Sequence, residues 1–175
     1  MKIGYAGKLG GSQYSLHDLC YLMETIVAIT PESEFHLAGE FTKKTSKTLC
    51  ALEYKIVERG YLTAFNLQKF YEEMDIIIIL IGNINSALNF IVPSKFYELI
   101  PVNKPKIIVC GKNSAVLNYK NDFTNFHYFL IEEKEHWQTK LINLPQKRIL
   151  GPSDLSKSRV YHRSNIAKLF FDIVL

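Results

Sequence analysis

A run of six apolar residues at positions 76–81 constrains the fold of this chain more than any other sequence feature. Strands of a half-exposed antiparallel sheet alternate apolar with polar residues, and this run does not. Six residues are also too few to cross a bilayer as a helix, which takes about 20. We therefore expect this run to belong to a central strand of a parallel sheet that is covered by helices on both faces.

Strand-like and helix-like segments alternate along the rest of the chain. Short β-branched or aromatic runs predict strands at residues 2–6, 34–38, 53–58, 75–80, 106–110 and 127–131. Apolar residues at helical spacing predict helices at residues 14–29, 64–74, 93–100, 132–144 and 159–173. Such alternation needs crossover connections, so it predicts an α/β three-layer sandwich with a mainly parallel sheet. We expect one domain over residues 1–175, with an irregular loop at residues 112–125.

Charge and cysteine content narrow the classes of partner. The net charge is +4, and the basic residues are scattered rather than gathered in one stripe, so we expect no nucleic-acid partner. Cys20, Cys50 and Cys110 form no C-x-x-C pair, which predicts buried thiols in a reducing compartment and neither a metal site nor a disulfide framework. Met1 leads directly into a strand-like run, so we expect no signal peptide and a cytoplasmic protein.

The loop after the first predicted strand is rich in glycine and reads Gly7-Lys8-Leu9-Gly10-Gly11-Ser12. Ligands of open parallel sheets bind at the carboxyl ends of the strands, where glycine lets an anion approach the backbone. We therefore consider Gly7, Lys8, Gly10 and Gly11 candidate phosphate contacts. The spacing matches neither a dinucleotide fingerprint nor a Walker loop, and an ordinary strand-to-helix turn is the alternative.

The predicted helix at residues 93–100 has two distinct sides. At 100° per residue, Phe96, Leu99 and Ile100 share an apolar side, and polar residues lie opposite. A carboxylate that faces the cleft can accept two hydrogen bonds from a vicinal diol such as a ribose. The candidate contacts on this helix are Ser94, Lys95 and Glu98. A solvated amphipathic helix on which Glu98 binds nothing is the alternative.

Four segments in this order resemble the C-terminal, donor-binding domain of GT-B glycosyltransferases of the group 1, capsule- and lipopolysaccharide-type family. Together they span residues 2–110. They are IGYAGKL at 3–9, FHLAG at 35–39, YEEMDI at 71–76, and PSKFYEL at 93–99 followed by NKP at 103–105. The resemblance implies a Rossmann-like domain, one half of a GT-B fold.

The resemblance also implies roles for individual residues. Glu98 would hold the ribose of a nucleotide diphosphate sugar of UDP or GDP type, with no separate cofactor. Gly7, Lys8 and the helix that starts near Ser94 would face the diphosphate. The Arg59-Gly60-Tyr61 loop would lie near the base. Asp75 would tie a strand to a neighbouring backbone N–H. Asn83 and Asn85 follow a strand and are candidate sugar contacts, with turn formation as the alternative.

This chain departs from the family pattern in several respects, including Asn103 where the pattern has glycine before Lys-Pro. Phe90 replaces a glutamate that members often carry near the sugar, and Gly10-Gly11-Ser12-Gln13 lacks the second basic residue that usually follows the first loop. The resemblance further implies that the acceptor-binding domain is absent and that another domain or a partner chain completes a hexosyltransferase for surface polysaccharide, inactive as this half alone. Peripheral association with the inner face of the membrane would occur through that missing half.

Two other functions remain compatible with these residues. The first is a non-catalytic GT-B-like half-domain that pairs with another chain, which Phe90 and the apolar C-terminal sequence favour. The second is an unrelated nucleotide-binding enzyme on a similar sheet, because such sheets support many activities.

Overall fold

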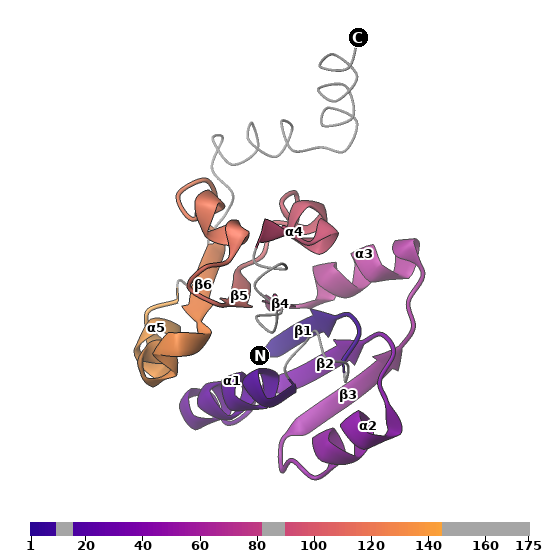
Figure 1. Cartoon of the computed structure of the whole chain (residues 1–175). Helices are drawn as coiled ribbons and strands as arrows, with labels where there is room; N and C mark the ends of the chain where they lie inside the picture. The colour runs from indigo at the N-terminus through magenta and orange to yellow at the C-terminus, as the bar shows by residue number, and fades with distance from the viewer. Residues whose placement is uncertain (10–15, 82–89, 145–175) are drawn as a thin grey trace.

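The computed structural model describes residues 1–9, 16–81 and 90–144, which form a six-stranded sheet (Figure 1). The strand order is β3-β2-β1-β4-β5-β6, and every neighbouring pair is parallel. The apolar run forms β4, between β1 and β5, as predicted for a strand covered on both faces. The strands are β1 (Lys2–Ala6), β2 (Glu34–Ala38), β3 (Lys55–Gly60), β4 (Ile76–Leu80), β5 (Lys106–Cys110) and β6 (Phe126–Leu130).

Helices cover both faces of the sheet, which confirms the predicted three-layer α/β architecture (Figure 1). One face packs against α1 (Leu16–Ile29), α2 (Lys43–Cys50) and α5 (Trp137–Ile142). The other face packs against α3 (Ala64–Glu73), α4 (Ser94–Leu99) and the 3-10 helix η2 (Ala115–Tyr119). A second 3-10 helix, η3 (Ile131–His136), leads into α5.

The alternation of side chains along each strand builds the two cores. On β1, Ile3 and Tyr5 point into the core beneath α1, whereas Ala6 belongs to the core beneath α3 and α4. Gly4 lies on the α3 side, where an added Cβ would come within 2.5 Å of Met74 Cγ. The glycine therefore allows α3 and the residue that follows it to pack close to β1.

Side chains fix several boundaries of these elements. Thr42 and Thr63 cap α2 and α3 by accepting hydrogen bonds from the backbone N–H groups of Thr45 and Asn66. Such caps satisfy amide groups that the first helical turn leaves unpaired. Asp75 accepts a hydrogen bond of 2.8 Å from the backbone N–H of Lys2, which confirms its predicted structural role.

Helix α2 was not predicted, because its sequence KKTSKTLC contains only two apolar residues, Leu49 and Cys50. It forms around the Thr42 cap and the burial of Leu49. The predicted loop at 112–125 contains η2, and the predicted helix at 132–144 is instead η3 and α5, with a non-helical residue at Glu133. The predicted helix at 159–173 lies outside the described residues.

The cysteine prediction is only partly correct. Cys110 is buried on β5, where desolvation raises the pKa of its thiol to about 12. Cys20 is partly buried, and Cys50 is exposed at the end of α2, so the expectation of a buried thiol is wrong there. Trp137 is fully buried at the start of α5 and anchors this helix in the core.

Candidate functional site

The candidate site lies where the order of the strands reverses. The chain builds outward from β1 through β2 to β3, and then returns to place β4 on the other side of β1. In open parallel sheets this arrangement leaves a crevice at the carboxyl ends of the two central strands. The loop that follows β1 begins at Gly7, and α4 is the first described helix after β4.

Lys95 joins these two segments. It is the second residue of α4, and its Nζ donates a hydrogen bond to the carbonyl of Ala6 at the end of β1. The ammonium also lies 5.7 Å from the centroid of the Tyr5 ring, which adds a cation–π attraction. A Cβ added to Gly7 would lie 2.4 Å from Lys95 Nζ, so the glycine leaves the space that this ammonium occupies.

A small cavity of about 20 Å³ lies beneath this contact, enough for about one water molecule. It marks the enclosed floor of the crevice rather than the space for a whole ligand. Tyr5 and Tyr71 in its wall were not predicted as site residues, because their positions read as core positions of a strand and a helix. The lining residues are Tyr5, Ala6, Tyr71, Ile78, Ile79, Leu80, Pro93, Lys95 and Leu99.

The charges in the crevice influence each other. Burial lowers the pKa of Lys95, and the nearby carboxylate of Glu98 acts in the opposite direction. Burial, with a smaller contribution from Glu98, raises the pKa of Tyr71. Glu98 itself is exposed on α4 together with Ser94, whereas Phe96, Leu99 and Ile100 are buried, as the helical spacing predicted.

The backbone after β1 continues the sheet rather than forming an open cradle. The N–H of Gly7 donates to the carbonyl of Ala38 at 2.8 Å, and the N–H of Leu9 donates to that of Glu40 at 3.3 Å. The first of these amides is therefore already engaged within the protein. The Lys8 side chain is exposed. The backbone carbonyl of Lys8 accepts a hydrogen bond from the Tyr5 hydroxyl at 3.1 Å.

The segment predicted to lie near the base, residues 59–61, spans the end of β3. Gly60 has a φ of 63°, a conformation that favours glycine, and its carbonyl accepts a hydrogen bond from Gly39. Tyr61 is 79% exposed. One strand, β2, lies between β3 and β1, so the end of β3 is two strand spacings, about 10 Å, from the end of β1. Gly60 and Tyr61 thus lie at the carboxyl ends of the strands, as Lys95 does, but at some distance from Lys95.

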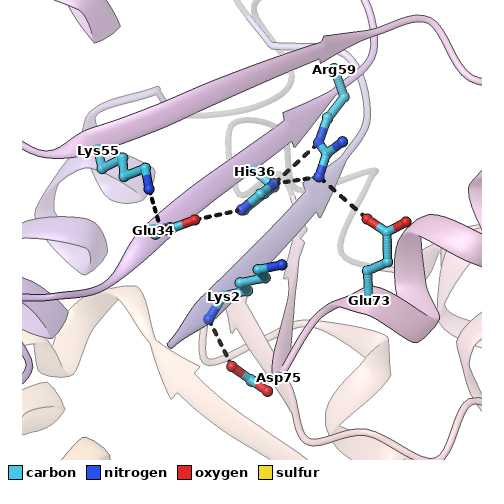
Figure 2. Close-up of polar contacts among 7 residues, drawn as sticks. All are labelled: Lys2, Glu34, His36, Lys55, Arg59, Glu73 and Asp75. Carbon is cyan, nitrogen blue, oxygen red and sulfur yellow. Dashed lines mark hydrogen bonds and ion pairs between the residues drawn. The ribbon is translucent and has the colours of Figure 1, made fainter.

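Arg59, the first residue of this segment, contacts other side chains of the protein. Figure 2 shows its guanidinium between His36 of β2 and Glu73 of α3. It donates to His36 Nδ1 from Nε at 3.1 Å and from an Nη at 3.0 Å, and it forms an ion pair with Glu73 at 3.3 Å. These contacts give Arg59 a structural role, and they leave Gly60 and Tyr61 as the ligand candidates of this segment.

The remaining predicted contacts, Gly10, Gly11, Asn83 and Asn85, lie outside the described residues. The described parts of the chain contain no group of three or more histidine, cysteine, aspartate or glutamate residues that could hold a metal ion. Within the same parts, no helix is both long enough and apolar enough to span a membrane.

A wider hollow of about 400 Å³ lies at β6, far from the reversal of strand order. Strands β4 and β5 separate β6 from β1, so this hollow is not continuous with the crevice at Lys95. Residues of β6 and α5 line it, together with Lys120 and Asn121.

Known proteins resemble this chain in structure but not detectably in sequence. No family model and no curated protein sequence matches it. TarM of S. aureus, solved as a mutant in complex with fondaparinux, α-GlcNAc-glycerol and UDP, matches with a TM-score of 0.69 and 16% identity. That match covers 98% of this chain and 34% of TarM. HepE of Anabaena, in complex with UDP and glucose, matches with a TM-score of 0.68 and 11% identity, over 99% of this chain and 47% of HepE.

A third solved structure consists of a single domain. The C-terminal domain of LpcC, a group 1 family glycosyl transferase of Francisella tularensis, matches with a TM-score of 0.60 and 16% identity. This match covers 94% of the present chain and 82% of the other. The chain therefore has the fold of the C-terminal half of a GT-B glycosyltransferase, and it spans only a third to about half of TarM and HepE.

Proposed function

We propose that this chain is the donor-binding half of a glycosyltransferase and binds a nucleoside diphosphate sugar of UDP or GDP type. One observation carries the proposal: α4 lies at the reversal of strand order, with its Lys95 against the end of β1 and Glu98 exposed on the same helix. The presence of UDP in the TarM and HepE structures supports it.

The candidate contacts divide the donor into three parts. Glu98 accepts two hydrogen bonds from the ribose hydroxyls. Gly60 and Tyr61 lie toward the base, and the exposed Lys8 and Ser94 lie toward the diphosphate. In sugar transfer, negative charge develops on the departing nucleoside diphosphate, and fixed positive groups stabilise it. Gly10, Gly11, Asn83 and Asn85 remain candidate contacts on the basis of the sequence.

Transfer itself needs a second domain. Because the chain spans only part of TarM and HepE, we propose that an acceptor-binding domain or partner chain faces this crevice during transfer to a surface polysaccharide or glycoconjugate. Closure by such a domain excludes water from the reacting sugar. We expect this half alone to bind its donor without turnover, and we place any attachment to the inner face of the membrane on the other half.

A specific observation favours a second function, a non-catalytic half-domain that pairs with another chain. Phe90, at the position where the resemblance leads us to expect a glutamate near the sugar, is 84% exposed, and Ile91 beside it is 54% exposed. Two exposed apolar side chains in sequence suit a contact with protein better than a contact with a sugar. In that case the chain forms a stable complex with its partner but binds no nucleotide.

Calorimetric titration with UDP, GDP, CDP and ADP tests the proposal. One of them should bind, and Glu98→Ala should weaken it roughly ten- to a hundredfold, because a lost charge-assisted hydrogen bond costs on the order of 1.5–3 kcal/mol. The 2′-deoxy form of the same nucleotide should bind weakly to the native chain and lose less on Glu98→Ala. Glu135→Ala, an exposed carboxylate on η3, is the control. No binding by any of the four nucleotides contradicts the proposal.

A further inference from the structure

The Lys95 ammonium has few hydrogen-bond partners for a group withdrawn from water. A lysine ammonium has three N–H donors. Within residues 1–9, 16–81 and 90–144, the structure gives Lys95 Nζ one acceptor, the Ala6 carbonyl, and the face of the Tyr5 ring. Burial of a cation with unfilled donors is unfavourable, which agrees with the lowered pKa of this group. An incoming anion would supply the missing acceptors.

The protein leaves space for this ammonium in an unusual way. Gly7 has no positive φ, since the described glycines with positive φ are Gly39 and Gly60. Its backbone conformation therefore does not require glycine. The space around it favours glycine, because a Cβ would lie 2.4 Å from Lys95 Nζ and 2.7 Å from the Tyr5 hydroxyl. Lys95 and Gly7 are thus matched to each other, although one is on α4 and the other follows β1.

The position of the pair indicates which part of a ligand it meets. Lys95 Nζ lies at the end of β1, beside the strand reversal, whereas Glu98 is three residues further along α4 and Tyr61 is two strands away. The N–H of Gly7 is already bonded to Ala38, so the glycine contributes space rather than a donor. The positive group presented to an anion here is the lysine side chain.

We propose that Lys95 is the principal diphosphate ligand of this site and that Gly7 sets its position. On binding, the ammonium donates to phosphate oxygens with the N–H groups for which the described residues supply no acceptor. Lys95 thereby replaces the second basic residue that the resemblance leads us to expect after Lys8, where the sequence has Gly10 and Gly11. This inference rests on the proposed function, and it assigns the largest share of the affinity for the diphosphate to one side chain.

The test compares a nucleoside, its diphosphate and inorganic pyrophosphate by calorimetry. Lys95→Met should lower affinity for the diphosphate and for pyrophosphate roughly ten- to a hundredfold and leave the nucleoside unchanged. Gly7→Ala keeps the charge but displaces the ammonium, so it should cause a smaller loss of the same kind. In the Lys95→Met background, Gly7→Ala should add nothing. Lys47→Met, which removes an exposed lysine of α2, is the control for net charge.

The outcomes separate this inference from the proposed function. If Glu98→Ala weakens the diphosphate but Lys95→Met and Gly7→Ala do not, the function stands and the inference is overturned. If no nucleotide binds but pyrophosphate binds through Lys95, the inference stands as an anion site and the function fails. If neither ligand binds the native chain, both are overturned. Thermal unfolding of each variant shows whether it is folded. If Lys95→Met is unfolded, the affinities of Gly7→Ala for the diphosphate and pyrophosphate decide between these outcomes.

Discussion

The Arg59 guanidinium donates two hydrogen bonds to Nδ1 of His36, at 3.1 and 3.0 Å, and so joins the end of β3 to the buried centre of β2 (Figure 2). Because Nδ1 accepts, the proton of the neutral ring lies on Nε2, 3.4 Å from a carboxylate oxygen of Glu34. Protonation of Nδ1 would remove the acceptor and place a second cation beside Arg59.

This geometry predicts that stability falls in mild acid. Burial lowers the pKa of His36 in the folded chain, with Arg59 adding to the effect and Glu34 opposing it. The unfolded chain therefore binds the proton first, and stability is lost as the pH falls below about 6.5, the ordinary histidine value. Urea unfolding at pH 7.5 and 5.5 measures the loss. His36→Gln should reduce it, and an equal loss in that variant would contradict the assignment.

A second loss is expected at lower pH, from Glu34. Its side-chain hydrogen bond with Lys55 lowers the pKa of the Glu34 carboxyl. A carboxylate of this kind stabilises the fold above its unfolded pKa, and the contribution disappears as the pH falls through the folded value. Glu34→Gln should therefore flatten the stability profile below about pH 4.5. Because the Glu34 carboxylate also raises the pKa of His36, the same variant should extend the His36 loss to lower pH in urea unfolding.

The hydrogen bond between Asp75 and the backbone N–H of Lys2 anchors the first strand. Asp75→Ala should destabilise the chain by about 1 kcal/mol, because one hydrogen bond of an exposed pair is lost. Asp75→Asn keeps an acceptor oxygen and should recover most of the loss. Chemical denaturation measures both, and equal stability of the alanine variant and the native chain would show that the bond contributes nothing.

Trp137 offers a direct optical test of the packing at α5. Its Nε1 donates to the Leu130 carbonyl at 2.8 Å, and its ring meets Tyr21 and Phe129 edge-on with centroids 5.5 and 5.8 Å apart. Trp137→Ala should cost about 3–5 kcal/mol. Trp137→Phe, which leaves the Leu130 carbonyl unpaired, should cost about 1–3 kcal/mol. Since the chain has one tryptophan, its native emission maximum should be blue-shifted, and emission typical of exposed indole would contradict this packing.

Gly4 predicts a compensating pair. Gly4→Ala forces a methyl group against Met74, 2.5 Å from its Cγ, and should destabilise by about 1–3 kcal/mol. Met74→Ala alone should also destabilise, because it leaves a cavity in the core. The double variant should be clearly more stable than the sum of the two losses predicts, and simple additivity would show that the two side chains do not meet.

The α/β fold could be predicted because its strands are apolar and because most of its helices carry apolar residues at helical spacing. Residues 76–81 identify the central strand without any knowledge of its neighbours. Helix α2 could not be found this way, since its stability depends on the Thr42 cap and the burial of a single leucine, Leu49. The burial of Lys106 could not be predicted either, because a lysine within a strand usually indicates an exposed position. Lys106 is fully buried, and its Nζ donates a hydrogen bond to the Val102 carbonyl.

The candidate site, too, could be predicted only in part. The two sides of α4 follow from helical spacing, so Glu98 and the buried Phe96 were placed correctly on opposite sides. The contact of Lys95 with Ala6 could not be read from the sequence, because it joins residues that are 89 positions apart and depends on the order of the strands. Neither the space that Gly7 provides nor the position of Tyr71 in the crevice wall has a local sequence signal.

We expect a nucleoside diphosphate to bind at the reversal of strand order. Amide chemical shifts of the isotope-labelled chain, followed during titration with UDP and then GDP, report binding residue by residue. Saturable shifts are expected at Gly7, Lys8, Lys95 and Glu98, with smaller ones at Gly60 and Tyr61, and none at Thr139 and Lys140 beside the β6 hollow. Shifts confined to that hollow, or no shifts with either nucleotide, would contradict this expectation.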